Sequence, residues 1–100
     1  MINLYKYTRP GRGEETVDTL LSRNGVRIER IVSNAARTGW YDQAEDEWVV
    51  LLEGTAELQI GDERVVLRRG DTVLLKAHQR HRVLGSSEDA LWLTVFIKEV

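Results

Sequence analysis

The feature of this sequence that most constrains its fold is a series of short segments rich in β-branched residues, separated by glycines and charged residues. Segments of this kind, about four to eight residues long and bounded by turn residues, are typical of β-strands. A closely spaced series of them predicts an all-β sandwich or barrel. The predicted strands cover residues 26–33, 48–53, 56–60, 64–68, 72–75, 80–84 and 91–98.

Two glycine-containing turns punctuate the second half of the chain. Gly61-Asp62 lies between two predicted strands and suits a two-residue hairpin turn of type II′, in which glycine supplies the positive φ. Arg69-Gly70-Asp71 is interpreted as another turn rather than as an adhesion tripeptide, because the sequence shows no export signal.

One segment departs from the strand pattern. Val17, Leu20 and Leu21 fall at helical spacing, acidic residues precede them, and Gly25 follows where a left-handed cap would sit. We therefore expect one short N-terminal helix over residues 14–24, preceded by a strand around Leu4, Tyr5 and Tyr7. The expected organisation is a single domain, with a strand, the helix and a strand in residues 1–35 and the main barrel in residues 40–98.

Composition excludes several classes of protein. The chain has 100 residues, enough for one hydrophobic core, and its 42% hydrophobic and 30% charged residues form no run long enough to span a membrane. With no cysteine, disulfides and thiolate chemistry are excluded, so a metal would need histidine, carboxylate or neutral oxygen ligands. A net charge of −2 and the lack of a helix-turn-helix argue against nucleic acid as a partner. We expect a cytoplasmic protein, since no secretory signal is visible.

Residues 48–52 and 91–97 are apolar at successive positions, so both faces of these strands need cover. One face fills the interior of the barrel. The other face is covered either by a partner subunit or by the N-terminal strand and helix. We expect a homodimer.

The segment from Trp40 to Val83 carries two partial motifs. Six residues separate Glu47 from Gly54, and ten residues separate Gly70 from His81. These spacings resemble the two conserved motifs of the cupin superfamily, in which Lys76 stands here for a proline, His78 for a glycine and Gly85 for an asparagine. The resemblance implies a cupin double-stranded β-helix, that is, a jelly-roll barrel with a central pocket.

In metal-binding cupins, two histidines and the glutamate of the first motif join the histidine of the second motif on one metal. The resemblance places Glu47 and His81 in that set, whereas the paired-histidine positions hold Tyr41 and Gln43, or Trp40 and Asp42. A divalent ion (Fe, Mn, Ni or Zn) held by Glu47, His81 and Gln43 is one hypothesis, because such sites use at least three protein ligands. Tyr41, Asp42 or His78 are alternative third ligands.

Glu47 and His81 also make chemical sense without a metal. A carboxylate that faces an imidazole inside an apolar barrel exchanges protons readily, with Glu47 as the base and His81 as the acid or orienting group. The competing interpretation is a buried, mutually hydrogen-bonded polar pair without a catalytic role.

Other residues extend the predicted pocket. Trp40 and Tyr41, in a loop, are expected to stack on a flat or sugar-like ligand, with Gln43 and His78 as further binding residues. Arg30 either points inward and clamps a carboxylate or is turned outward by a β-bulge. The sequence thus predicts a small-molecule cupin, either a metal-dependent oxygenase or isomerase, or an acid–base enzyme, with a non-catalytic ligand-binding or sensory module as the alternative.

Overall fold

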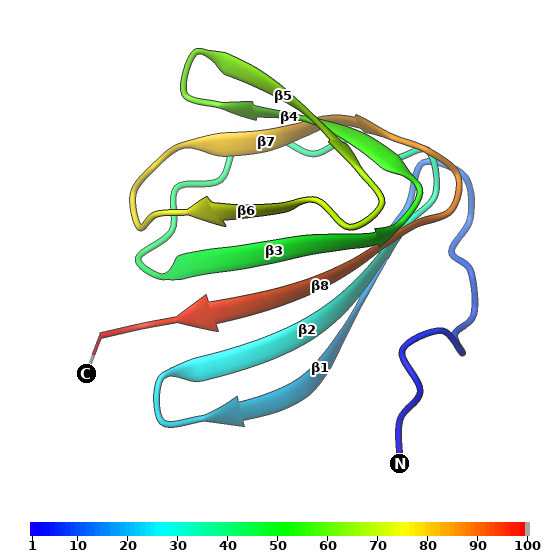
Figure 1. Ribbon diagram of the computed structural model, residues 1–100, viewed down its shortest axis with the longest axis horizontal. Helices are drawn as coiled ribbons and strands as arrows, with labels where there is room; N and C mark the ends of the chain where they lie inside the picture. Colours follow the sequence, from blue (N-terminus) through cyan, green and yellow to red (C-terminus); the bar gives the residue numbers. More distant parts are fainter. Residues whose placement is uncertain (100) are drawn as a thin grey trace.

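The computed structural model describes residues 1–99, which form eight strands and no helix. The strands make two antiparallel sheets, one of five strands in the order β1-β2-β8-β3-β6 and one of three in the order β5-β4-β7 (Figure 1). The described part of the chain therefore has no helix that is long and apolar enough to span a bilayer. The strands are β1 (Glu15–Arg23), β2 (Val26–Ser33), β3 (Asp46–Glu53), β4 (Thr55–Ile60), β5 (Glu63–Arg68), β6 (Thr72–Leu75), β7 (His81–Ser86) and β8 (Ala90–Ile97).

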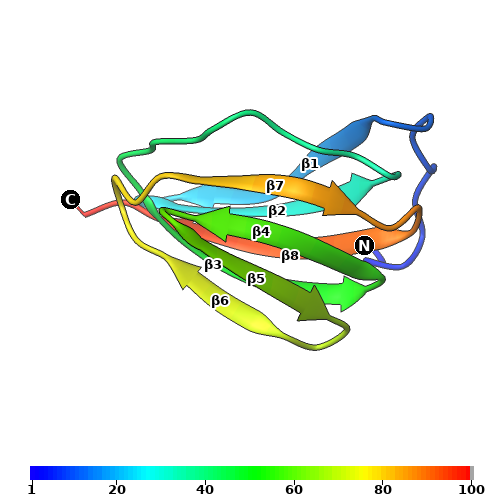
Figure 2. The same cartoon turned by 90° about the horizontal axis from the view of Figure 1, so that it is seen from above.

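The two sheets face each other, and their inner side chains form the core (Figure 2). Leu51 of β3 and Trp92 of β8 come from the larger sheet, and Leu58 of β4 and Leu67 of β5 from the smaller one; all four are at most 4% exposed. Successive residues of a strand point to opposite faces, so every second residue enters this core. This is the all-β jelly-roll architecture expected from the sequence.

The connection between β2 and β3 closes one side of the sandwich. Thr38 N–H donates to Val83 O (3.0 Å), Tyr41 N–H to His81 O (2.8 Å), and Ser86 N–H to Ala36 O (3.0 Å). The segment 34–45 thus runs along the free edge of β7 and hydrogen bonds to it without forming a regular strand. It supplies a wall of irregular backbone beside the three-stranded sheet.

Both predicted turns are confirmed. Ile60 pairs with Glu63 across a two-residue loop in which Gly61 has φ +57°, while Asp62 is not among the residues with positive φ, as a type II′ turn requires. Gly70 adopts φ +90°, and Asp71 N–H donates to Arg68 O at 2.9 Å. The seven strands predicted between residues 26 and 98 are all present, with ends that differ from the prediction by at most two residues.

The prediction of an N-terminal helix was wrong. Residues Glu15–Arg23 form β1, which pairs with β2 through a hairpin whose loop residues Asn24 and Gly25 have φ +48° and +79°. Asn-Gly is a strong hairpin signal, because both residues tolerate positive φ. A bulge between Thr19 and Leu21 shifts the register of β1. The bulge changes which face the later residues occupy, so apolar residues at helical spacing arise within a strand.

The prediction of a strand around Leu4, Tyr5 and Tyr7 was also wrong, because the first 14 residues are irregular. Residues 3–6 lie against the outer face of the larger sheet, where Arg30 binds their carbonyl groups. Its Nη1 donates to the carbonyl oxygens of Asn3 (3.1 Å), Leu4 (3.4 Å) and Lys6 (3.1 Å), and its Nη2 donates to Asp18 Oδ2 at 2.7 Å.

Arg30 therefore anchors the chain's own N-terminal segment and does not point into the pocket. The pairing of β2 with β8 runs without a register shift from Val26 to Ser33, so no bulge turns Arg30 outward. Strict alternation places it on the outer face with Ile28 and Val32, and the N-terminal segment supplies the cover that this face needs there. Arg30 as a whole is 8% exposed.

Candidate functional site

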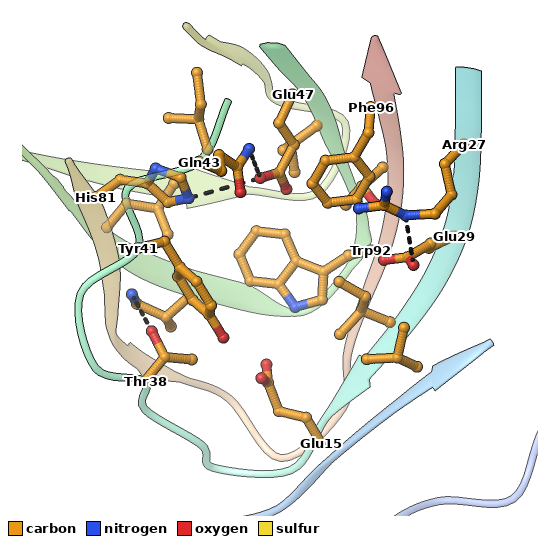
Figure 3. Close-up of a pocket in the computed structure, with 17 residues that line it drawn as sticks. Glu15, Arg27, Glu29, Thr38, Tyr41, Gln43, Glu47, His81, Trp92 and Phe96 are labelled. Atoms are coloured by element: carbon orange, nitrogen blue, oxygen red, sulfur yellow. Dashed lines mark hydrogen bonds and ion pairs between the residues drawn. The ribbon is translucent and has the colours of Figure 1, made fainter. Parts of the chain in front are cut away.

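A cavity of about 280 Å³ lies between the two sheets. Its apolar lining includes Trp92 and Phe96, both on β8 (Figure 3). Its polar lining comprises Glu15, Arg27, Glu29, Thr38, Tyr41, Gln43, Glu47, His81 and Thr94. A largely apolar cavity with a few convergent polar groups is the usual form of a small-molecule site.

Strand register determines which residues reach this cavity. Arg27 of β2 and Glu47 of β3 both pair with Phe96 of β8, and these three residues form one row across the sheet. The next inward row consists of Glu29, Thr94 and Val49. Because the side-chain period of a strand is two, the rows follow from the register alone.

Glu47 and His81 meet across the cavity from different sheets. Glu47 lies on β3 of the larger sheet, and His81 is the first residue of β7 in the smaller one. Glu47 Oε1 lies 3.6 Å from His81 Nε2 and accepts a hydrogen bond from Gln43 Nε2 at 3.1 Å. Glu47 is 8% exposed and His81 is 5% exposed. The pair is thus withdrawn from solvent and held by a neighbouring amide.

The imidazole of His81 is oriented by the backbone. Its Nδ1 lies 3.1 Å from Gln79 O, which can only accept a hydrogen bond, so Nδ1 carries a proton and Nε2 faces Glu47. Burial by itself lowers the pKa of His81, but the Glu47 carboxylate and the Gln79 carbonyl oxygen outweigh it. The net result is a pKa above the ordinary value of 6.5. His81 therefore retains its proton to a higher pH than a free histidine.

Tyr41 forms the wall beside His81. The two rings stack with centroids 5.5 Å apart at an interplanar angle of 29°, and the two backbones pair in an antiparallel bridge. Burial and the charges of Glu15 and Glu47 raise the pKa of the Tyr41 phenol above 10.0. Tyr41 is consequently a neutral hydrogen-bond donor near pH 7 and a poor source of a phenolate ligand.

Of the six predicted site residues, Glu47, His81, Gln43 and Tyr41 line the cavity, whereas Trp40 and His78 do not. His78 adopts φ +61° in the turn before β7, and its side chain is 71% exposed beside Asp42 (Nδ1 to Oδ1, 3.0 Å). Trp40 lies against the guanidinium groups of Arg80 (4.5 Å) and Arg82 (4.4 Å). Both residues belong to the outer surface. They lie in irregular segments, where the alternation of a strand does not predict the direction of a side chain.

The residues present do not fit the predicted metal site. The part of the chain that the structure describes contains no group of three or more His, Cys, Asp or Glu side chains placed to hold a metal ion. Gln43 directs its amide nitrogen, which has no lone pair to offer, at Glu47. With only Glu47 and His81 as suitable donors, the set falls short of the three protein ligands typical of such sites. We therefore derive no step through a metal.

Sequence reasoning missed the cavity residues contributed by β1, β2 and β8, which are Glu15, Val17, Arg27, Glu29, Ile31, Trp92, Thr94 and Phe96. Glu15 was hidden by the helix prediction. Arg27 and Glu29 alternate with Ile28 and Arg30, but the apolar side of this strand faces outward under the N-terminal segment. The alternation was visible in the sequence, whereas the identity of the inward face was not.

Comparison with known families identifies the chain. A family model described as "Cupin domain" matches residues 29–96, which is more than half of the sequence. The protein belongs to the cupin family, as its jelly-roll fold and its two motif remnants indicate. A comparison with curated proteins found no match.

Solved structures agree with this assignment. A protein of Ralstonia eutropha JMP134, provisionally described as a mannose-6-phosphate isomerase, is 35% identical with a TM-score of 0.91, over 99% of this chain and 98% of that one. KdgF from a Halomonas species (15% identity, TM-score 0.83) is matched over 99% of this chain and 92% of its own. A cupin superfamily protein of Desulfitobacterium hafniense (15% identity, TM-score 0.82) is matched over 92% and 84%. The last two likenesses concern the fold alone.

Proposed function

We propose that the protein binds a small carbonyl-containing molecule in the cavity and isomerises it by proton transfer, with Glu47 as general base and His81 as general acid. The observation that carries this proposal is the approach of Glu47 Oε1 to His81 Nε2 (3.6 Å) between facing sheets, inside a cavity of about 280 Å³. Positioned acid–base pairs in apolar pockets contribute rate factors of about 10²–10⁴.

The protonation states suit these roles. The raised pKa of His81 favours an imidazolium that can donate a proton, and Glu47 beside it acts as the carboxylate that accepts one. For a substrate with a hydroxyl group on the carbon next to the carbonyl, Glu47 would take the proton from that carbon while His81 protonates the carbonyl oxygen, which gives an enediol. Glu47 would then return the proton to the former carbonyl carbon, and His81 would take the proton of the original hydroxyl group, whose oxygen becomes the new carbonyl oxygen. The description of the Ralstonia neighbour as a mannose-6-phosphate isomerase supports this reaction class.

Solvent exchange tests the proposal directly. Incubation with a panel of aldoses, hydroxyketones and mannose 6-phosphate in D₂O, followed by NMR, should show deuterium entering a carbon-bound position of one member. Glu47→Gln and His81→Asn should each lower the exchange rate by about 10²-fold or more. Glu63→Gln, at an exposed position of β5, is the matched control and should leave the rate unchanged.

Two results would contradict the proposal. Exchange that persists in both variants would assign the chemistry to other residues. Binding of a panel member without exchange would leave a ligand-binding protein in which Glu47, His81 and Gln43 only satisfy one another's hydrogen bonds.

We also propose that two copies of the chain associate through the outer face of the larger sheet. An apolar row crosses all five strands there: Leu21 pairs with Ile28, Ile28 with Val95, Val95 with Trp48, and Trp48 with Leu74. Leu21, Trp48 and Leu74 are 43%, 38% and 49% exposed. The N-terminal segment binds the same face at Arg30 but leaves these three residues exposed. An exposed apolar row of this kind on one face of a sheet favours a twofold dimer, in which the same patch of each copy meets the other.

A further inference from the structure

The charges around the cavity limit which ligands it accepts. Three carboxylates line it (Glu15, Glu29 and Glu47), against one guanidinium (Arg27) and one imidazole (His81). We propose that the site selects ligands that carry no negative charge and that donate hydrogen bonds through hydroxyl or amine groups, and that it rejects phosphorylated and carboxylated molecules. This inference rests on the proposed function and names the substrate class of that site: among the panel above, unphosphorylated aldoses or hydroxyketones should react and mannose 6-phosphate should not.

The one guanidinium in the lining already faces carboxylates of the protein along both of its two-donor edges. Arg27 Nε donates to Glu29 Oε2 (3.0 Å), and its Nη1 and Nη2 donate to the two carboxylate oxygens of Glu45 (2.9 and 3.3 Å). Its guanidinium carbon also lies 4.1 Å from the centroid of the Phe96 ring. Recognition of phosphate or carboxylate by arginine needs a free edge with two N–H groups. Arg27 has no such edge left for a ligand.

His81 does not supply a free cationic group for an anionic ligand either. Its Nε2 is directed at Glu47 and its Nδ1 at Gln79 O, so a proton on the imidazole compensates the Glu47 charge rather than that of a ligand. Arg27 and His81 together thus balance carboxylates that the protein itself provides.

Glu15 is the carboxylate without such compensation. It accepts a hydrogen bond from Ser33 Oγ at 2.5 Å, and Ser33 Oγ accepts one from Trp92 Nε1 at 3.0 Å. Among the described residues, no basic side chain forms an ion pair with Glu15. An anion that enters the cavity meets this charge at short range in a partly enclosed space, where repulsion is stronger than in bulk water. A hydroxyl or ammonium group meets an acceptor instead.

A second polar group in the lining lacks a partner. Thr94 is 1% exposed, and its hydroxyl forms no hydrogen bond within the described chain. It lies in the inward row between Glu29 and Val49. Since buried hydroxyls are ordinarily hydrogen bonded, this one is available to pair with a molecule in the cavity, either water or a hydroxyl or amine group of a ligand. A polar, uncharged ligand does so without bringing a charge next to Glu29.

A matched set of probes tests the selection by charge. Benzyl alcohol, benzylamine and benzoate have similar shapes and are neutral, cationic and anionic near pH 7. Titration of the full chain, followed by the NMR shifts of the Trp92 indole N–H and neighbouring cavity residues, should give a dissociation constant for benzoate at least about tenfold weaker than for the better of the other two. Glu15→Gln should reduce this difference in dissociation constant, whereas the exposed control Glu63→Gln should leave it unchanged.

Each outcome has one meaning. Benzoate that binds as tightly as benzyl alcohol and benzylamine overturns the selection by charge and leaves the proposed function intact. If benzoate binds Glu15→Gln with the same disadvantage in dissociation constant as it binds the wild type, the role given to Glu15 is overturned. If none of the three probes shifts the cavity resonances, the inference is overturned, whereas the proposed function is decided separately by the exchange experiment in D₂O. A preference for benzylamine that disappears in Glu15→Gln identifies amines, rather than alcohols, as the preferred donors.

Discussion

The two faces of the five-stranded sheet are built from the same strands, yet they have opposite character. On β2, Arg27 and Glu29 enter the cavity while Ile28 lies outside in an apolar row; on β3, Glu47 enters and Trp48 lies outside. The inner face places charged groups among the apolar residues of the cavity, and the outer face exposes apolar groups to solvent. Alternation along a strand thus encodes a binding site and an association surface in one stretch of sequence.

Substitutions of comparable leucines give the largest expected contrast between the faces. Leu51 is fully buried in the core, so Leu51→Ala should lower the free energy of unfolding by about 2–5 kcal/mol through lost burial and the resulting cavity. Leu74 is 49% exposed, so Leu74→Ala should change the free energy of unfolding of the monomer by less than about 0.5 kcal/mol. Chemical denaturation at low protein concentration measures both. Equal losses would show that the outer row contributes to the core.

Trp48→Glu tests the outer face itself. The charge would lie in the middle of the apolar row, so it should weaken self-association about 100-fold while leaving the fold intact. Light scattering across a concentration series measures the mass, and circular dichroism checks the fold. Glu63→Gln is the control. A wild-type chain that stays monomeric throughout the series would refute the proposed dimer.

Thr94→Val tests the inner face with a change of nearly constant volume. Removal of a buried hydroxyl that has no partner should raise the stability of the ligand-free protein by about 1 kcal/mol. The same change should weaken the binding of benzyl alcohol, because the hydroxyl is then missing from the cavity. Loss of stability in Thr94→Val would mean that the hydroxyl already has a partner.

A smaller effect should appear as a dependence of stability on pH. The pKa of His81 is raised in the folded state above the value of 6.5 expected in the unfolded chain, so the folded state binds the proton more tightly. This contribution is fully present below about pH 6.5 and is lost as the pH rises through the folded pKa. Denaturation of wild type and His81→Asn across this range should show the loss only in the wild type. If the free energy of unfolding depends on pH in the same way in both proteins, His81 does not interact measurably with Glu47.

The sequence by itself determined the class of fold, because β-branched segments and glycine turns specify strands and hairpins locally. The Gly61 turn and the strands 26–33 and 72–75 were predictable for this reason. The sequence also indicated Glu47 and His81 as candidate site residues, since the spacing of the cupin motifs is retained around them. The helix over residues 14–24 failed because a bulged strand and an amphipathic helix share the same local pattern.

Tertiary structure alone decided which face of each strand looks inward. Arg27, Glu29 and Arg30 alternate on β2, and only the docking of residues 3–6 onto Arg30 shows that the arginine belongs outside. The same holds for Trp40 and His78, which lie beside the motif in sequence but outside the cavity in space. Local propensities fix backbone conformation, whereas the burial of a side chain depends on residues distant in the chain, and these become neighbours only in the folded state.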